Sequence, residues 1–443
     1  NTLIGGLAGD ALTDADFNVA VGQDALTADT LGSRSIAIGR RSLYTQNFTS
    51  ATDTYNIAVG FNAGYSITTG VENVLIGGLA GDALTSSADN TAVGYQALGS
   101  ATTGNENTAI GHSALFTNIL SDRNVALGVD ALRNHNQASS IDSYNTAVGY
   151  NSGASVTTGL RNTLIGGLAG DALTDSDDNV AIGQTALGSD TLGSKSVAVG
   201  RAALATQNFT SATDSYNTAV GFQAGEAVTT GLKNTIIGGI AGDLTTTGDF
   251  NTFIGYDVGS SNVGGDNNTI VGAGSNVAAT GTDAAVGLGP NISCVAAFTT
   301  LGSGTSDIRA AHGNVTWSTV SDQRYKKDIV NSTAGLSFIN DLTPRTFKYK
   351  NLGELPETFN AYKADSTDVF KNSVTNHGFI AQEVKTAIDA HPELKDGFAL
   401  WGERPDGGQE IGEAALIPML VKAVQELSTS LDAALARITT LEG

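Results

Sequence analysis

The segment TVSDQRYKKDIV, residues 319–330, gathers several of the side chains in this sequence that are best able to do chemistry. A serine hydroxyl becomes a nucleophile when a neighbouring base takes its proton, and a lysine can be that base only after its ammonium has lost a proton. Ser321 and Lys326 lie five residues apart. In a serine-rich chain this spacing arises often by chance. The sequence around the two residues must therefore show whether they form a catalytic pair.

Patterns that would hold a metal are weak elsewhere. The Asp-rich turn TDSDDN, residues 174–179, lacks the twelfth-position glutamate of a calcium loop, and we interpret it as a solvated turn. The histidines lie far apart, without the spacing of ligands. They are His112, His135, His312, His377 and His391. We therefore expect no metal and no other cofactor.

The composition divides the chain into two unlike parts. Residues 1–300 carry 9 Lys and Arg against 25 Asp and Glu, whereas residues 301–443 carry 14 against 19. The net charge of −21 argues against binding of nucleic acid.

One cysteine, Cys294, allows no internal disulfide, and no apolar stretch is long enough for membrane insertion. Because the sequence begins at Asn1, in the middle of a repeat and not at a Met, we expect the chain to be a fragment of a longer one.

A short motif, Asn followed by three mostly apolar residues and Gly, recurs through the first part. Successive copies are 17 residues apart twelve times and 21 apart three times. Copies start at Asn1, Asn18, Asn56, Asn73, Asn90, Asn107, Asn124, Asn145, Asn162, Asn179, Asn217, Asn234, Asn251 and Asn268, with Ser35 and Ser196 in the Asn place of two more. Each unit holds one short β-branched run, which predicts a strand.

No unit of this size can bury a core alone, so the units are expected to stack as coils of a β-solenoid. The constant Asn can hydrogen-bond along the stack, and the constant Gly can form a corner that a side chain would block. Each coil is poor in large apolar residues, which favours three chains packed together. Over residues 1–272 the repeats resemble the head repeats of trimeric autotransporter adhesins and of phage tail fibres, which form a trimeric β-roll.

The chain changes character after the repeats. Residues 273–320 read as degenerate repeats leading into a β stem, and residues 321–414 read as an α+β domain. Within that domain, residues 344–351 alternate like a strand, and residues 377–394 begin as a strand and become a helix that ends near Pro392. Residues 415–443 carry apolar side chains at alternating spacings of three and four, which predicts a coiled coil. This seam consists of Ile417, Leu420, Val424, Leu427, Leu431, Ala434, Ile438 and Leu441.

Three motifs in this order, SDQRYKKDI (321–329), GFIAQEV (378–384) and LIPMLVKAVQEL (416–427), resemble the self-cleaving intramolecular chaperone domain of endosialidases and of many phage tail spikes and fibres. The resemblance implies that the domain trimerises, guides folding of the β-rich fibre before it, and then cuts the chain ahead of the motif serine. The expected fold is mostly β: a trimeric β-solenoid of 17-residue coils, a small α+β chaperone domain and a C-terminal coiled-coil helix.

Carried onto this sequence, the resemblance implies that Ser321 is the nucleophile, Lys326 the base and Val320–Ser321 the scissile bond. The Ser321 hydroxyl would attack the carbonyl of Val320, and water would hydrolyse the resulting ester. Arg324 and Lys327, together with burial in a closed trimer, would lower the pKa of Lys326. An oxyanion donor is required, and the sequence does not identify it. Possible supporting residues are Asp322, Arg324, His377, Gln382 and Glu383.

The predicted protein is a structural phage tail fibre or spike segment that recognises a host surface, with one autoproteolytic cut per chain as its only chemistry. Its partners would be two further copies of itself, a host receptor or glycan, and an upstream fibre or tail protein. It would fold in the host cytoplasm and act on the virion tail, outside the host cell. Two alternatives stay open: a bacterial trimeric surface adhesin, and a polysaccharide depolymerase spike whose catalytic domain lies outside this sequence.

Overall fold

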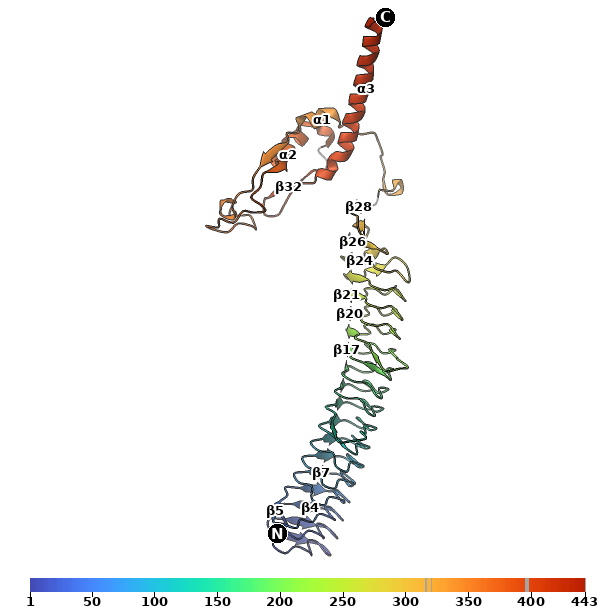
Figure 1. Ribbon diagram of the computed structural model, residues 1–443, viewed down its shortest axis with the longest axis vertical. Helices are drawn as coiled ribbons and strands as arrows, with labels where there is room; N and C mark the ends of the chain where they lie inside the picture. Colours follow the sequence, from blue (N-terminus) through green and yellow to red (C-terminus); the bar gives the residue numbers. More distant parts are fainter. Residues whose placement is uncertain (315–316, 320, 395–397, 443) are drawn as a thin grey trace. The chain divides into compact units, whose positions relative to one another are not determined.

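A computed structural model describes residues 1–314, 317–319, 321–394 and 398–442. The chain divides into two compact units, the solenoid unit Asn1–Val320 and the C-terminal unit Ser321–Gly443. Figure 1 shows the coils of the solenoid unit stacked one on another, and the helices of the C-terminal unit.

The solenoid unit is built on one long parallel ladder of short strands, one strand from each coil. The first ten are β1 (Thr2–Ile4), β2 (Val19–Val21), β4 (Ile36–Ile38), β6 (Ile57–Val59), β7 (Val74–Ile76), β8 (Thr91–Val93), β9 (Thr108–Ile110), β11 (Val125–Leu127), β13 (Thr146–Val148) and β14 (Thr163–Ile165). The ladder continues with β15 (Val180–Ile182), β17 (Val197–Val199), β19 (Thr218–Val220), β20 (Thr235–Ile237), β21 (Thr252–Ile254), β22 (Thr269–Val271) and β24 (Val286–Leu288). The predicted mostly β fold, with a solenoid of 17-residue coils, is confirmed.

Strand pairing keeps equivalent residues of neighbouring coils in line. In the β8–β9 pair, Ala92 lies opposite Ala109 and Val93 lies opposite Ile110. From β2 onward the middle residue of each ladder strand points inward and is buried, whereas the residues on either side are half-buried or exposed. Small Ala and medium Leu side chains fill the interior, and the outward-pointing residues of the ladder are half-buried or exposed.

The repeated Asn side chains form the predicted hydrogen-bonded ladder inside the stack. The backbone N–H of Asn124 donates to Asn107 Oδ1 over 3.0 Å, and Asn107 Nδ2 donates to the carbonyl of Ser121 over 3.0 Å. Both Asn side chains are buried. Each Asn therefore satisfies backbone groups that the tight coil would otherwise leave without a partner.

The repeated Gly at the end of each strand is also explained by the stack. Gly77 has φ of +135°, a conformation that side chains disfavour. A Cβ there would lie 2.4 Å from the carbonyl oxygen of Gly94 in the next coil. The predicted role of the Gly as a corner that excludes a side chain is confirmed.

The 21-residue intervals form wider coils that carry a second short parallel pairing. The pairs are β3 (Gly32–Ser33) with β5 (Thr52–Asp53), β10 (Ser121–Asp122) with β12 (Ile141–Asp142), and β16 (Gly193–Ser194) with β18 (Thr213–Asp214). Where the first wide coil stacks on the coil before it, the buried carboxylate of Asp29 in that preceding coil accepts hydrogen bonds from Gln46 Nε2 of the wide coil at 2.6 Å and from the N–H of Gly32 at 3.0 Å. Asp190 and Gln207 repeat this contact at 2.6 Å where the third wide coil stacks on the coil before it. The second has Asn118 and His135 at these places, and burial lowers the pKa of His135 to about 4.

The far end of the solenoid unit changes to antiparallel pairing. The pair β23 (Asn276–Val277) and β25 (Ser293–Cys294) is still parallel, and β26 (Phe298–Ser303) still pairs in parallel with β24. β27 (Ser306–Ala311) then runs antiparallel to β26, and β28 (Ser318–Thr319) runs antiparallel to β27. These three strands form the stem.

The C-terminal unit is a small α+β domain followed by a long helix. Its elements are η1 (Gln323–Tyr325), α1 (Leu336–Asp341), β29 (Arg345–Phe347), η2 (Leu352–Glu354), β30 (Asn376–Gly378), α2 (Ala381–Ala390), η3 (Pro392–Leu394), β31 (Trp401–Glu403), β32 (Gln409–Ile411), η4 (Glu413–Leu416) and α3 (Ile417–Glu442). Phe338 of α1, Val384 of α2 and Met419 of α3 meet in its core. The predicted strand and helix around residues 377–394 are confirmed as β30 and α2.

Helix α3 packs on the domain through its first turns only. Glu426 Oε2 accepts a hydrogen bond from the N–H of Leu336 over 2.8 Å, which ties α3 to the start of α1. Farther along, the apolar residues of the predicted seam are exposed in the single chain, including Leu427, Leu431 and Ile438. No helix in the described part of the chain is both long enough and apolar enough to cross a bilayer.

Candidate active site

The predicted nucleophile and base flank one turn of 3₁₀ helix, η1, at the start of the C-terminal unit. Asp322 caps this turn, because its carboxylate accepts a hydrogen bond from the N–H of Arg324 at 2.8 Å. The N–H of Lys326 donates to the carbonyl of Gln323 at 3.0 Å and closes the turn. A short polar side chain at the cap is the local reason that the backbone turns here.

The turn brings Lys326 onto Ser321. Lys326 Nζ donates a hydrogen bond to Ser321 Oγ over 2.7 Å, and both residues are exposed. This separation lies in the range of a nucleophile and its base. A lysine ammonium can only donate, whereas a neutral amine could accept the hydroxyl proton. The single chain thus supplies the contact between the two side chains.

Arg324 is bound to Asp322. Its Nη2 lies 2.6 Å from Asp322 Oδ2, and its Nε lies 3.0 Å from Oδ1. Hydrogen bonds from the side chain and backbone of Arg324 hold the pKa of Asp322 below its usual range, and the same pairing raises the pKa of Arg324. The guanidinium charge that was expected to act on Lys326 is therefore largely offset by a carboxylate two residues away.

The scissile bond itself is not placed. Val320 lies outside the described residues, so the position of its carbonyl relative to Ser321 Oγ stays a prediction. The donor that would stabilise an oxyanion at that carbonyl is likewise not identified by the described residues.

The residues of the second motif lie elsewhere in the C-terminal unit. Arg345 of β29 makes a two-pronged ion pair with Glu383 of α2, with Nη2–Oε1 at 2.8 Å and Nε–Oε2 at 3.0 Å. This contact holds the pKa of Glu383 below its usual range. Gln382 is exposed on the same helix, and its carbonyl accepts from Thr386 Oγ1 at 3.0 Å.

His377 is exposed on β30, opposite Thr346 of β29. It lines a pocket of about 350 Å³ with Pro344, Arg345, Thr346, Gly378, Phe379 and Glu413. Within the described residues, no hydrogen bond or ion pair joins His377, Gln382 or Glu383 to the Ser321–Lys326 pair. The structure therefore brings Ser321, Asp322, Arg324 and Lys326 together and sets the other three apart.

One charged cluster was missed by sequence reasoning. The nearly buried ring of His391 contacts Asp341 at the end of α1 and Glu393 in η3. The ring edge also packs on Phe338, with centroids 5.4 Å apart. In the sequence His391 was one of five scattered histidines, and no local signal links it to a carboxylate 50 residues earlier.

Comparison with known proteins bears on this unit. Residues 321–392 match the family described as chaperone of endosialidase. The match begins at Ser321 and spans η1, the β29–β30 pair and α2. No curated protein and no solved structure matches the chain.

A solenoid followed by a domain that matches this chaperone family fits the class of fibrous tail proteins that carry their own folding domain. More particularly, a solenoid of 17-residue coils followed by this chaperone fits a phage tail fibre or spike of the endosialidase type.

Proposed function

We propose that the chain is a homotrimeric tail fibre segment that recognises a host surface, and that its C-terminal unit directs trimerisation and then cuts the chain between Val320 and Ser321. The observation that carries the cleavage proposal is the 2.7 Å hydrogen bond between Lys326 Nζ and Ser321 Oγ, at the residue where the chaperone match begins.

The proposed reaction has two steps. In the first, a neutral Lys326 amine takes the proton of Ser321 Oγ, the oxygen bonds to the Val320 carbonyl carbon, and the Val320–Ser321 C–N bond breaks as the Ser321 nitrogen takes a proton. The product is an ester between Val320 and the Ser321 side chain. In the second step, water adds to this ester and releases a carboxylate on Val320 and the hydroxyl of Ser321. The enzyme acts once and on its own chain.

Assembly of three chains is supported by the outward side of the ladder. The third residue of each ladder strand is Val, Ile or Leu in every coil from β1 to β24, and it is never buried. A continuous apolar column of this length is unusual on the surface of a monomer and is typical of an interface. Copies of the same column, one on each chain, would cover one another.

The seam of α3 supports the same conclusion for the C-terminal unit. Its apolar residues, spaced alternately by three and four, are exposed and would pack as a coiled coil with two further copies. Trimerisation at this end would fix which coils of the three chains face one another, because nearly identical coils alone do not specify one register. Removal of the chaperone would then leave a fibre that is trapped kinetically.

Intact-mass analysis of the freshly expressed chain tests the cleavage. The wild type should give two polypeptides, of 320 and 123 residues from the 443, joined in the uncut chain at Val320–Ser321. Ser321→Ala and Lys326→Ala should stay whole. Lys348→Ala is the matched control, because it removes an exposed lysine of the same unit that lies outside the motif, and it should leave the cut unchanged.

Lys326→Arg separates charge from base function, since arginine keeps the positive charge but does not lose its proton. It should also stay whole. A wild type that is trimeric yet uncut would refute the protease proposal and leave the C-terminal unit as a permanent trimerisation cap.

A further inference from the structure

The stem carries a pocket that the proposed cleavage does not use. In the antiparallel register, Thr299 of β26 lies opposite Ala310 of β27, and the β27–β28 register, extended by one residue, places Trp317 beside Ala310. Residues directly opposite one another in antiparallel strands point to the same face. The three therefore form a row across the stem, with small Ala310 between a hydroxyl and an indole.

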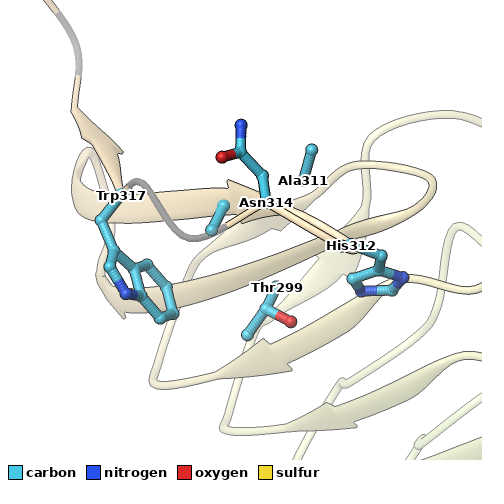
Figure 2. Close-up of a pocket in the computed structure, with 7 residues that line it drawn as sticks. Thr299, Ala311, His312, Asn314 and Trp317 are labelled. Carbon is cyan, nitrogen blue, oxygen red and sulfur yellow. The ribbon is translucent and has the colours of Figure 1, made fainter.

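This row opens into a pocket of about 330 Å³, whose further lining residues are Ala311, His312, Gly313 and Asn314. Figure 2 shows Trp317 on one side of Thr299 and His312 on the other. Half of the Trp317 surface is exposed. Gly313 has φ of +81°, so the turn that carries His312 and Asn314 past β27 suits glycine.

The chemistry of the lining selects a ligand class. An exposed indole offers a flat apolar surface, and the Thr299 hydroxyl and the His312 imidazole offer hydrogen bonds at defined positions. A pocket of this size that combines an aromatic wall with a few polar groups suits a small ligand with one apolar and one polar face. A sugar ring has such faces, with C–H groups on one side and hydroxyls around the edge.

We propose that this stem pocket binds a single neutral sugar ring of a surface glycan, stacked on Trp317. The proposal deepens the host-recognition role proposed above and rests on it. None of the lining residues is Lys, Arg, Asp or Glu, and the chain carries a net charge of −21, so an acidic sugar would meet no compensating cation here. Every lining residue precedes Val320 and stays with the solenoid unit after the proposed cut.

Tryptophan fluorescence tests the pocket in the full-length chain. The sequence has two tryptophans, Trp317 and Trp401, so Trp401→Phe leaves Trp317 as the only indole. Titration with glucose, galactose, N-acetylglucosamine and N-acetylgalactosamine should change its emission saturably for at least one sugar, with a dissociation constant on the order of 1 mM. Glycerol and N-acetylneuraminic acid should give no saturable change.

Ala310→Leu fills the floor of the pocket while keeping Trp317 as the reporter, and should weaken binding by about tenfold or more. The matched control is Ala311→Leu, which adds the same volume at the rim and should weaken binding less. Saturation-transfer NMR on the wild type and on Trp317→Ala provides a second readout that does not depend on the Trp401 substitution.

The proposal is overturned if no neutral sugar gives a saturable change by either method, or if Trp317→Ala leaves sugar binding intact. An indole covered by another copy of the chain would give the first of these results. The uncut Ser321→Ala chain should bind sugar as the wild type does. Failure of cleavage, read by mass, and failure of the pocket, read by titration, are thus separate outcomes.

Discussion

His391 Nε2 lies 2.8 Å from Asp341 Oδ2, and Nδ1 of the same ring lies 3.0 Å from Glu393 Oε1. One imidazole therefore joins the end of α1 to η3 inside the C-terminal unit. Both ring nitrogens can donate at once only when the ring is protonated. The hydrogen bond to Asp341, reinforced by Glu393, raises the pKa of His391 above its ordinary value, although burial opposes this.

The C-terminal unit should lose stability as the pH rises above neutrality. Because folding raises the pKa of His391, its contribution is complete below the unfolded pKa of about 6.5 and is lost as the pH passes the folded value. Glu393, whose pKa is lowered by a backbone hydrogen bond and by the His391 ring, is ionised throughout this window. We expect the calorimetric melting temperature of this unit to fall between pH 6 and pH 9, by about 4 °C for each kcal/mol lost.

His391→Gln should flatten this dependence by removing the titrating group. His377→Gln, which changes an exposed histidine of the same unit, should leave it as it is. An unchanged slope in His391→Gln would show that another group is responsible.

Neighbouring glycines in one coil should respond very differently to substitution. A Cβ at Gly77 would lie 2.4 Å from the Gly94 carbonyl oxygen at a positive φ, whereas a Cβ at Gly78 would meet only the Tyr95 ring at 3.5 Å. We expect Gly77→Ala to lower the free energy of unfolding by about 2 kcal/mol or more and Gly78→Ala by less than about 0.5 kcal/mol. Urea unfolding followed by circular dichroism measures both; equal effects would contradict the corner geometry.

The Asn ladder predicts that removal of a buried Asn side chain lowers the free energy of unfolding. Asn107→Ala removes the acceptor of the Asn124 N–H, which leaves a buried donor without its partner. The expected loss is about 1–3 kcal/mol in urea unfolding. Exposed Asn134 provides the comparison, since Asn134→Ala should change stability by less than about 0.5 kcal/mol.

A charge in the α3 seam should prevent assembly. Leu427→Asp would bury a carboxylate at the proposed interface, whereas Ser428→Asp adds the same charge outside the seam of the same helix. Light scattering after size exclusion should find Leu427→Asp monomeric or aggregated and Ser428→Asp trimeric. A trimeric Leu427→Asp chain would exclude α3 as the trimerisation element.

The repeat period, the Asn ladder and the Gly corner could be predicted from sequence because each follows from a residue that recurs at a fixed place. The left-handed backbone at Gln96 (φ 58°) and Leu98 (φ 52°) could not, since such residues rarely adopt it. Their N–H groups donate to Gly78 and Ala114 in the neighbouring coils, at 3.1 Å each. These bonds exist only in the stack, so no local propensity reveals them.

The candidate site was predictable to a similar extent. The motif that suggested Ser321 and Lys326 also formed the turn that joins them, because both depend on a few consecutive residues. The pairing of Arg324 with Asp322, which offsets the guanidinium charge, could not be predicted, since side-chain direction is not encoded in spacing. The contact between Asp341 and His391 depends on the tertiary packing of α1 against α2, whose last turn His391 caps.

The buried carboxylates of Asp29 and Asp190 distinguish particular positions in the stack of coils. Most coils have nearly the same sequence. The Asp29 carboxylate, however, accepts its hydrogen bond from Gln46 only when the wide coil that carries Gln46 is the next coil in the stack. A chain that skipped a coil would bury this carboxylate without that hydrogen-bond donor, at a cost of about 1–3 kcal/mol or more. The wide coils therefore help to fix the stacking register, because a chain that is shifted by one coil loses these buried hydrogen bonds.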